Sequence, residues 1–257
     1  MTVLYAILFG LVQGLTEFLP VSSSGHLVLL NNIFGASNNF LFFTLLLHLA
    51  TLLAVFVVLR KEILYLIKNP FSKETKRLVL ATIPTVIIVL IFETFVKDMF
   101  GGGLLKYCFL ITAILLFVTD MLSKRNESGK EFGYKSAFLM GIAQGIAVLP
   151  GISRSGATIC IGLLSGEDRK ETAKFSFLMS VPIILASMLY EILGAVRSGQ
   201  ALIDAGTILP TIVAFVVAFI TGIFAIKFMI KIVEKARYFW FSIYLILIVM
   251  LMIIFGL

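Results

Sequence analysis

GLVQGLTEFLPVSSSGH (Gly10–His26) and GIAQGIAVLPGISRSGA (Gly141–Ala157) are two similar stretches of one 257-residue chain. Five identical residues recur at an offset of 131 positions: Gly10, Gln13, Gly14, Ser24 and Gly25 correspond to Gly141, Gln144, Gly145, Ser155 and Gly156. Pro20 corresponds to Pro150 at an offset of 130. Two apolar segments often look alike by chance, but chance does not explain agreement at Gln, Pro and Ser. The chain therefore contains an internal repeat.

The composition excludes a soluble protein. The chain is 60% hydrophobic and 14% charged, whereas soluble domains are about half apolar and about a quarter charged. Apolar runs of about 18 residues or more, the length that crosses the hydrocarbon of a bilayer, recur along the chain. The 24 Phe residues do not follow the alternating pattern of a membrane β-barrel. We therefore expect an all-α, polytopic integral membrane protein.

The apolar segments differ in length, and this difference predicts the architecture. Six are long enough to span the membrane: residues 40–59, 78–96, 104–122, 172–194, 207–226 and 238–257. The repeated regions, 1–34 and 136–166, each contain two shorter apolar halves separated by Pro, Ser and Gly. We expect each to form a re-entrant helix–loop–helix hairpin, buried in protein or lining a wet cavity. The prediction is one membrane domain over residues 1–257.

The basic residues predict the orientation. Connections 60–77, 123–135 and 227–237 carry six, four and four of them, two thirds of the chain's 21, whereas 97–103 and 195–206 carry one each. By the positive-inside rule the three rich connections are cytoplasmic and the two poor ones are outside. The net charge of +7 is accounted for by these membrane anchors, so we expect no nucleic-acid partner.

The two hairpins are predicted to enter the membrane from opposite faces. Three full spans, an odd number, separate them, so the first enters from outside and the second from the cytoplasm. Such an inverted-topology repeat is expected to carry its site where the broken helices meet. The second helix of each hairpin begins at SSSG or SRSG, and two helix N-termini facing one pocket favour an anion. In the alternative interpretation, the glycines and prolines only kink tightly packed helices.

Charged groups inside apolar spans are costly and indicate function. Glu17 lies one helical turn after Gln13, so both side chains share a face. Arg154 lies at the tip of the second hairpin. If the tips meet, a carboxylate, a guanidinium, several hydroxyls and the imidazole of His26 share one pocket. The weaker alternatives are that His26 is a buried or capping histidine and that Arg154 is a membrane anchor. His48 could equally line the pocket or make a structural hydrogen bond.

These groups suit a phosphate ester or anhydride. An arginine clamps phosphate oxygens with two hydrogen bonds. Glu17 with Gln13 offers hard oxygen ligands for Mg²⁺ or Ca²⁺, and such ions usually also bind the substrate's phosphates. A serine hydroxyl beside a histidine has the arrangement of a nucleophile and its base.

The same residues carry a resemblance to a known family. QGLTEFLPVSSSGH (Gln13–His26) and PGISRSGAT (Pro150–Thr158) resemble the two signature regions of the bacterial undecaprenyl-diphosphate phosphatases, the BacA/UppP family. The similarity extends over the whole chain, including FSFLMSVP (Phe175–Pro182) after the second signature. The family's first signature opens with Glu or Gln and has Glu four residues later. Many members have Glu at the first position, where this chain has Gln13.

The resemblance implies an integral membrane enzyme that hydrolyses undecaprenyl diphosphate to undecaprenyl phosphate and phosphate. It would recycle the lipid carrier for peptidoglycan and other wall polymers, and its overproduction would raise bacitracin tolerance. The resemblance also implies dependence on a divalent metal. The site would open to the outer face of the bacterial cytoplasmic membrane.

Matching the motifs residue by residue implies roles for the tip residues. Glu17 corresponds to the metal-binding or acid–base carboxylate, Ser23 to the proposed nucleophile and His26 to the proposed general acid/base. Arg154 and Ser153 correspond to the diphosphate clamp. The remaining tip residues are expected to contact the substrate, and they are Ser22, Ser24, Gly25, Ser155, Gly156 and Thr158.

Several alternatives stay open at this point. A water activated by Glu17 or His26 could attack in place of Ser23. A transporter or flippase of a prenyl phosphate lipid or another anion is the main rival function, because many transporters are built from inverted repeats. A scaffold subunit is the weakest alternative, since no connection is long enough to form an interaction domain. The sequence is compatible with a homodimer but does not specify an oligomeric state.

Overall fold

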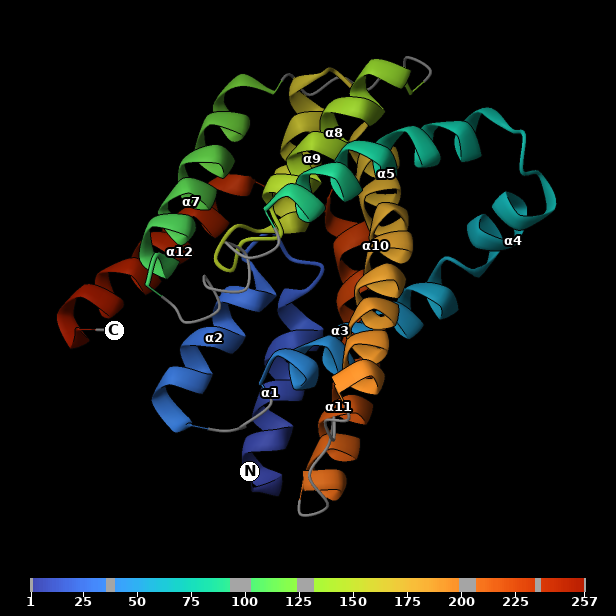
Figure 1. The fold of residues 1–257 in the computed structure, drawn as a ribbon. Coiled ribbons are helices and arrows are strands. Elements are labelled where there is room, and N and C mark those ends of the chain that lie inside the picture. The colour runs from blue at the N-terminus through green and yellow to red at the C-terminus, as the bar shows by residue number, and fades with distance from the viewer. Residues whose placement is uncertain are drawn as a thin grey trace.

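The computed structural model describes residues 2–35, 40–92, 103–123, 132–198, 207–233 and 237–256. Within these ranges the chain forms eleven helices and no strand, which confirms the all-α prediction (Figure 1). Five of these helices contain segments long and apolar enough to cross a membrane, at Phe40–Val58, Leu105–Leu122, Arg169–Gly194, Ile208–Lys231 and Tyr238–Phe255. The chain is therefore a multi-pass helical membrane protein.

The two repeated regions each form a pair of short helices. The first pair is α1 (Val3–Thr16) and α2 (Ser23–Phe34), and the second is α8 (Tyr134–Ile146) and α9 (Arg154–Leu164). As predicted, each second helix begins within the Ser-rich segment that follows the proline. With 14, 12, 13 and 11 residues, all four are shorter than the roughly 20 residues that a spanning helix needs.

Of the seven remaining helices, six correspond to the predicted spans, and the helix at Arg60–Lys68 lies in the predicted connection 60–77. The seven are α3 (Phe40–Val58), α4 (Arg60–Lys68), α5 (Lys73–Ile91), α7 (Leu105–Leu122), α10 (Arg169–Ser198), α11 (Ile208–Ile232) and α12 (Tyr238–Phe255). The predicted span 78–96 corresponds to α5, which is not among the five apolar spans because charged residues occupy its first turn. The last residues of that prediction, 93–96, lie outside the described ranges. So do most of the predicted connections 97–103, 123–135 and 195–206.

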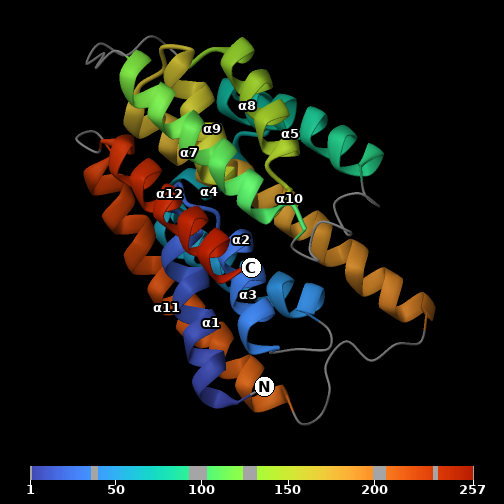
Figure 2. The same cartoon turned by 90° about the vertical axis from the view of Figure 1, so that its left-hand side faces the viewer.

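The two halves of the chain are intertwined. Helix α1 of the first half packs along α11 of the second, and α8 of the second half packs along α5 of the first. Both pairs lie side by side in Figures 1 and 2. A Cβ atom on Gly141 would overlap the carbonyl oxygen of Ala81, and one on Gly10 would approach the carbonyl of Ala214 to 2.5 Å. Two of the repeated glycines therefore allow close helix packing. Tight packing is one part of the alternative interpretation, in which the glycines and prolines only kink tightly packed helices.

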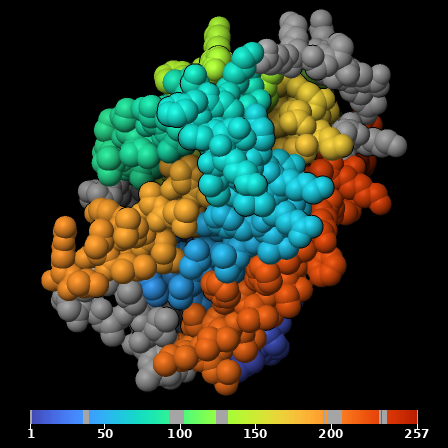
Figure 3. All heavy atoms as spheres, turned by 90° about the vertical axis from the view of Figure 1, so that its right-hand side faces the viewer, coloured from blue at the N-terminus to red at the C-terminus, as the bar shows by residue number. Residues whose placement is uncertain are grey.

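The hydrophobic core surrounds both hairpins. Its largest cluster includes Phe18 after α1, Phe109 of α7, Ile159 of α9 and Phe177 of α10. The rings of Phe18 and Phe177 meet edge to face with centroids 5.3 Å apart. Helix α4 lies on the outer surface of the molecule (Figure 3). Because the core packs against the hairpins from several helices, it holds their tips in a defined relation to each other.

Candidate functional site

The tips of the two hairpins contact each other directly. The hydroxyl of Ser22 accepts a hydrogen bond from the backbone N–H of Gly151 (3.1 Å) and donates to the carbonyl of Ile152 (3.3 Å). From the opposite tip, the Ser155 hydroxyl donates to the carbonyl of Leu19 (2.9 Å). A Cβ on Gly25 would lie 2.8 Å from the Gly151 backbone nitrogen. The predicted meeting of the two tips is present in the structure, and the backbones touch where Gly25 faces Gly151.

Ser22 has an unusual backbone conformation. Its φ of +66° lies in the left-handed region, which residues other than Gly rarely adopt. The ring Nδ1 of His26 donates to the Ser22 carbonyl (2.7 Å), and the Ser22 hydroxyl accepts from the Gly25 N–H as the N-cap of α2. Strained residues of this kind persist where surrounding contacts hold them, and they often occur at functional sites.

A cavity of about 130 Å³ lies beside the joined tips. Its polar wall comes mainly from the tips and from α3, with one residue each from α8 and α10. Helices α3 and α10 also supply an apolar wall that includes Leu41, Leu45, Ile183 and Ile184. The residues of the polar wall are Glu17, Ser22, Ser23, Ser24, Thr44, His48, Gln144, Ser153, Arg154, Ser155 and Ser187. A polar end beside an apolar wall matches a molecule with a polar head and an apolar tail.

Glu17 is the centre of the polar network. Its side chain is only 2% exposed, and its Oε1 forms an ion pair with Nη2 of Arg154. Its Oε2 accepts hydrogen bonds from the hydroxyl of Ser23 (2.5 Å) and from Nε2 of Gln13 (2.9 Å). Nε2 of His48 lies 3.4 Å from the same Oε2. A buried carboxylate needs such partners, because an unpaired charge away from water is costly.

The two repeats contribute different residues at equivalent positions. At the offset of 131, Glu17 corresponds to Val148 and Ser23 corresponds to Arg154, and all four line the cavity. Ser23 and Arg154 are the first residues of α2 and α9. One repeat therefore supplies the carboxylate and the hydroxyl while the other supplies the guanidinium. As a result, the pseudo-symmetric pair of tips builds one asymmetric site.

His26 does not line this cavity. Its Nε2 forms a hydrogen bond with the hydroxyl of Tyr244 in α12 (2.8 Å), and its ring stacks on Tyr244 and meets Phe109 edge to face. Since Nδ1 already donates to Ser22, both ring nitrogens have protein partners. This arrangement does not support the direct acid–base role that the resemblance implies for His26. The imidazole beside Glu17 is instead that of His48. From the sequence, His48 could equally line the pocket or make a structural hydrogen bond.

The other predicted contact residues divide into two groups. Ser22, Ser24, Ser153 and Ser155 line the cavity, and Ser153 also caps α9 by accepting from the Gly156 N–H (3.0 Å). Three predicted substrate contacts, Gly25, Gly156 and Thr158, are not part of its wall. The Thr158 hydroxyl instead donates to the carbonyl of Arg154 (2.8 Å).

Gln13 is also absent from the cavity wall. It lies behind Glu17, and its amide nitrogen also donates to the Thr51 hydroxyl (3.3 Å). Its Oε1 is buried and has no hydrogen-bond partner.

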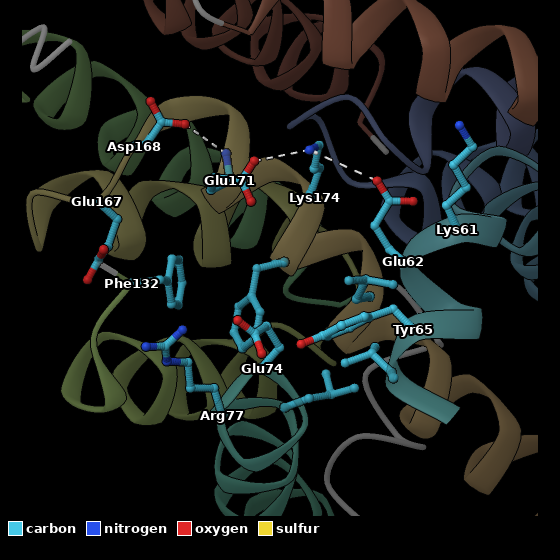
Figure 4. A pocket seen from close by; sticks show the side chains of 14 residues that line it. Lys61, Glu62, Tyr65, Glu74, Arg77, Phe132, Glu167, Asp168, Glu171 and Lys174 are labelled. Carbon is cyan, nitrogen blue, oxygen red and sulfur yellow. Dashed lines mark hydrogen bonds and ion pairs between the residues drawn. The ribbon is translucent and has the colours of Figure 1, made fainter. Parts of the chain in front are cut away.

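A larger cavity of about 620 Å³ lies between α4, α5 and α10 (Figure 4). Lys174 reaches across it and pairs with Glu171 (3.0 Å) and Glu62 (4.0 Å). Arg77 lies over the ring of Tyr134, with 5.3 Å from its Cζ to the ring centroid. The described lining includes no Ser, Thr, His or Cys. The contacts of Lys174 connect α4 to α10, and the lining lacks the serine beside a carboxylate that the tips provide.

Comparison with known proteins identifies the family of this chain. Residues 6–251 match the sequence model of a family described as "Bacitracin resistance protein BacA". The chain belongs to this family. A relative from Carboxydothermus hydrogenoformans, named undecaprenyl-diphosphatase, is 43% identical over 244 residues, which cover 93% of this chain and 92% of the relative. A second protein of that name, from Christiangramia forsetii, is 40% identical and covers 100% of this chain and 99% of the relative. A third, from Halothermothrix orenii, is 36% identical over 95% of this chain and 94% of the relative.

Proposed function

We propose that this member of the BacA family hydrolyses undecaprenyl diphosphate to undecaprenyl phosphate and inorganic phosphate. The observation that carries the proposal is the convergence of Glu17, Ser23 and Arg154 from two hairpins on one cavity. The names of the relatives supply the substrate class. The apolar wall formed by α3 and α10 suits the prenyl chain of such a lipid, which would extend from the cavity into the bilayer.

The proposal includes an arrangement in the membrane. Helices α3, α5, α7, α10, α11 and α12 would be the six spans, and the pairs α1–α2 and α8–α9 would be re-entrant hairpins of an inverted repeat. Lengths below that of a spanning helix support the re-entrant assignment. The basic connections would face the cytoplasm of a bacterial cell, and the site would open to the outer face of the cytoplasmic membrane. The enzyme would there recycle the carrier lipid for peptidoglycan and other wall polymers, and overproduction would raise bacitracin tolerance.

In the proposed reaction Ser23 is the nucleophile and Glu17 is its base. The Ser23 oxygen bonds to the terminal phosphorus while the bond from that phosphorus to the bridging oxygen breaks. The hydroxyl proton passes to Glu17 Oε2, only 2.5 Å away, and the bond electrons leave with undecaprenyl phosphate. Arg154 neutralises charge on the phosphate oxygens. Water then hydrolyses the phosphoserine and releases phosphate.

A divalent cation, Mg²⁺ or Ca²⁺, is part of the proposal. The donor set fits such an ion, because the Glu17 carboxylate and serine hydroxyls line the cavity and Mg²⁺ usually completes its shell with substrate phosphates and water. When bound, the ion would add positive charge where the reaction builds negative charge. Gln13 fits less well as a ligand, since it is not part of the cavity wall.

The decisive experiment measures phosphate release from undecaprenyl diphosphate by the purified protein in detergent. We expect Ser23→Ala to abolish turnover, whereas Ser242→Ala should retain it. Ser242 is a matched control because, like Ser23, it is buried and its hydroxyl donates a hydrogen bond within the protein. Its acceptor is the carbonyl of Ala113, and it lies away from the cavity. Acid quenching with substrate labelled at the terminal phosphate should trap label on Ser23. Turnover by Ser23→Ala at more than a tenth of the wild-type rate would assign the attack to water.

A transporter or flippase is the second candidate function. The intertwined pairing of α1 with α11 and α8 with α5 is the observation that favours it, because alternating-access proteins use paired repeats. The assay above separates the two functions. Hydrolysis without a membrane gradient supports the enzyme, and lipid binding without phosphate release supports the transporter. A homodimer is compatible with either function.

A further inference from the structure

His48 directs its ring Nε2 towards Glu17 in the cavity. Its Nδ1 lies 2.7 Å from the carbonyl oxygen of Thr44, one turn earlier in α3. A carbonyl can only accept, so the Nδ1 proton is donated there, and in the neutral ring Nε2 carries the lone pair. Nε2 is the atom that faces Glu17, and His48 lines the cavity.

The contact between His48 and Glu17 is not a good hydrogen bond. Nε2 lies 3.4 Å from Glu17 Oε2, whereas charge-assisted N–H···O bonds measure about 2.7–2.9 Å. Oε2 already accepts from Ser23 and from Gln13, which occupy its two lone-pair directions. The Nε2 atom of His48 and the Oε2 atom of Glu17 thus line one cavity at close range without a short hydrogen bond between them. A shared positive ion is an arrangement that makes this proximity favourable.

The separation of the two atoms fits a shared metal ion. Ligand atoms about 2.0–2.2 Å from a metal, at angles between about 90° and 109°, lie about 2.8–3.6 Å from each other. A histidine that binds a metal through one nitrogen usually donates the other N–H to a carboxylate or backbone carbonyl, as His48 does to Thr44. When the ion binds Oε2, it takes the lone pair that accepts from the Gln13 amide, which keeps the Thr51 hydroxyl as its partner. The other lone pair of Oε2 stays with the Ser23 hydroxyl, whose proton it accepts in the proposed reaction.

We propose that His48 Nε2 and Glu17 Oε2 together bind the divalent cation of this site, so that His48 takes the role predicted for Gln13. This inference rests on the proposed function, because phosphate oxygens of the substrate and water would complete the shell. Within the described part of the chain, no three His, Cys, Asp or Glu side chains gather around one point. An imidazole ligand suits Zn²⁺ better than Ca²⁺, which prefers oxygen ligands.

The test uses Mn²⁺ as the probe and a spectrum as the readout. The full-length protein, carrying a tag without histidine, is stripped with EDTA in detergent and loaded with Mn²⁺ alone. Electron spin echo modulation then detects imidazole nitrogen bound to Mn²⁺. The chain has only two histidines, so His26→Gln is the matched control for His48→Gln. We expect nitrogen modulation in the wild type and in His26→Gln, and its loss in His48→Gln. His48→Asn, which also lacks an imidazole, replaces His48→Gln if that variant does not fold.

Mn²⁺ affinity gives a second readout. Removing an outer-shell partner of a metal ligand costs about 10–100-fold in affinity, so losing a direct ligand should weaken Mn²⁺ binding at least tenfold. Ca²⁺ affinity should change less. The inference is overturned if wild-type protein shows no nitrogen modulation, or if His48→Gln retains it. Phosphate release by the same wild-type preparation reports separately on the proposed function. Turnover without nitrogen coordination would therefore reject His48 as a ligand and leave the phosphatase intact.

Discussion

The ion pair between Glu17 and Arg154 gives the sharpest test of how the site is stabilised. The Glu17 side chain is 2% exposed and that of Arg154 is 19% exposed. Removing one partner of a buried ion pair typically costs about 3–5 kcal/mol, because the other charge is left unpaired. Ser23 and Gln13 still donate to Glu17 in Arg154→Ala, so we expect the lower limit, about 3 kcal/mol. That loss is about a hundredfold in the unfolding equilibrium.

A second substitution identifies the cause of this loss. Glu17→Gln removes the buried charge, so Arg154→Ala combined with Glu17→Gln should be about 2 kcal/mol more stable than Arg154→Ala alone. Both variants should be inactive, which separates stability from catalysis. The free energy of unfolding is measured by SDS titration in mixed micelles, followed by circular dichroism.

Lys174→Ala provides the matched control for charge removal. Lys174 and its partner Glu171 are 25% and 59% exposed, so this exposed pair should contribute no more than about 0.5 kcal/mol. The reasoning is refuted if Arg154→Ala unfolds within about 0.5 kcal/mol of the wild type. It is also refuted if the double variant is no more stable than Arg154→Ala.

Four further outcomes are expected. Glu17→Gln should lower the rate of phosphate release about 10²–10⁴-fold in the detergent assay, because Ser23 loses its base; a smaller loss would remove Glu17 from that role. Gly141→Leu should lower the free energy of unfolding by at least about 2 kcal/mol, since any side chain there meets the backbone of Ala81; normal stability would contradict the close packing of α5 and α8. Lys174→Ala should keep its turnover, because the larger cavity lacks the catalytic groups. EDTA should suppress turnover and Mg²⁺ should restore it, and full activity in EDTA would reject the metal.

The hairpins were predictable because their signals are local. Pro20 and Pro150 disfavour continuation of the helices that precede them, and a Ser-rich segment beyond a proline favours a helix start. The structure begins α2 at Ser23 and α9 at Arg154, within the predicted segments. The predicted encounter of Glu17, Ser23 and Arg154 also occurs, because the repeat brings equivalent tips together.

The direction of the two histidines was not predictable in the same way. His26 follows the Ser-rich tip in sequence, yet it turns towards Tyr244, which is 218 positions later. His48 lies in the middle of an apolar span, yet it faces Glu17. Which face of a helix meets a distant helix depends on the packing of the whole bundle, and neighbouring residues carry little information about it. For the same reason, Gln13 was predicted at the cavity but lies behind Glu17.

By itself, the sequence determined the class of the protein, its internal repeat and the residues at each hairpin tip. These follow from the length of apolar runs and from Pro, Gly and Ser, whose effects act within a few residues. Only the tertiary structure decided that α1 packs on α11 and α8 on α5, and that His48 rather than His26 faces the carboxylate. The physical reason is that such contacts join residues distant in the chain, and their geometry depends on how every helix packs against its neighbours.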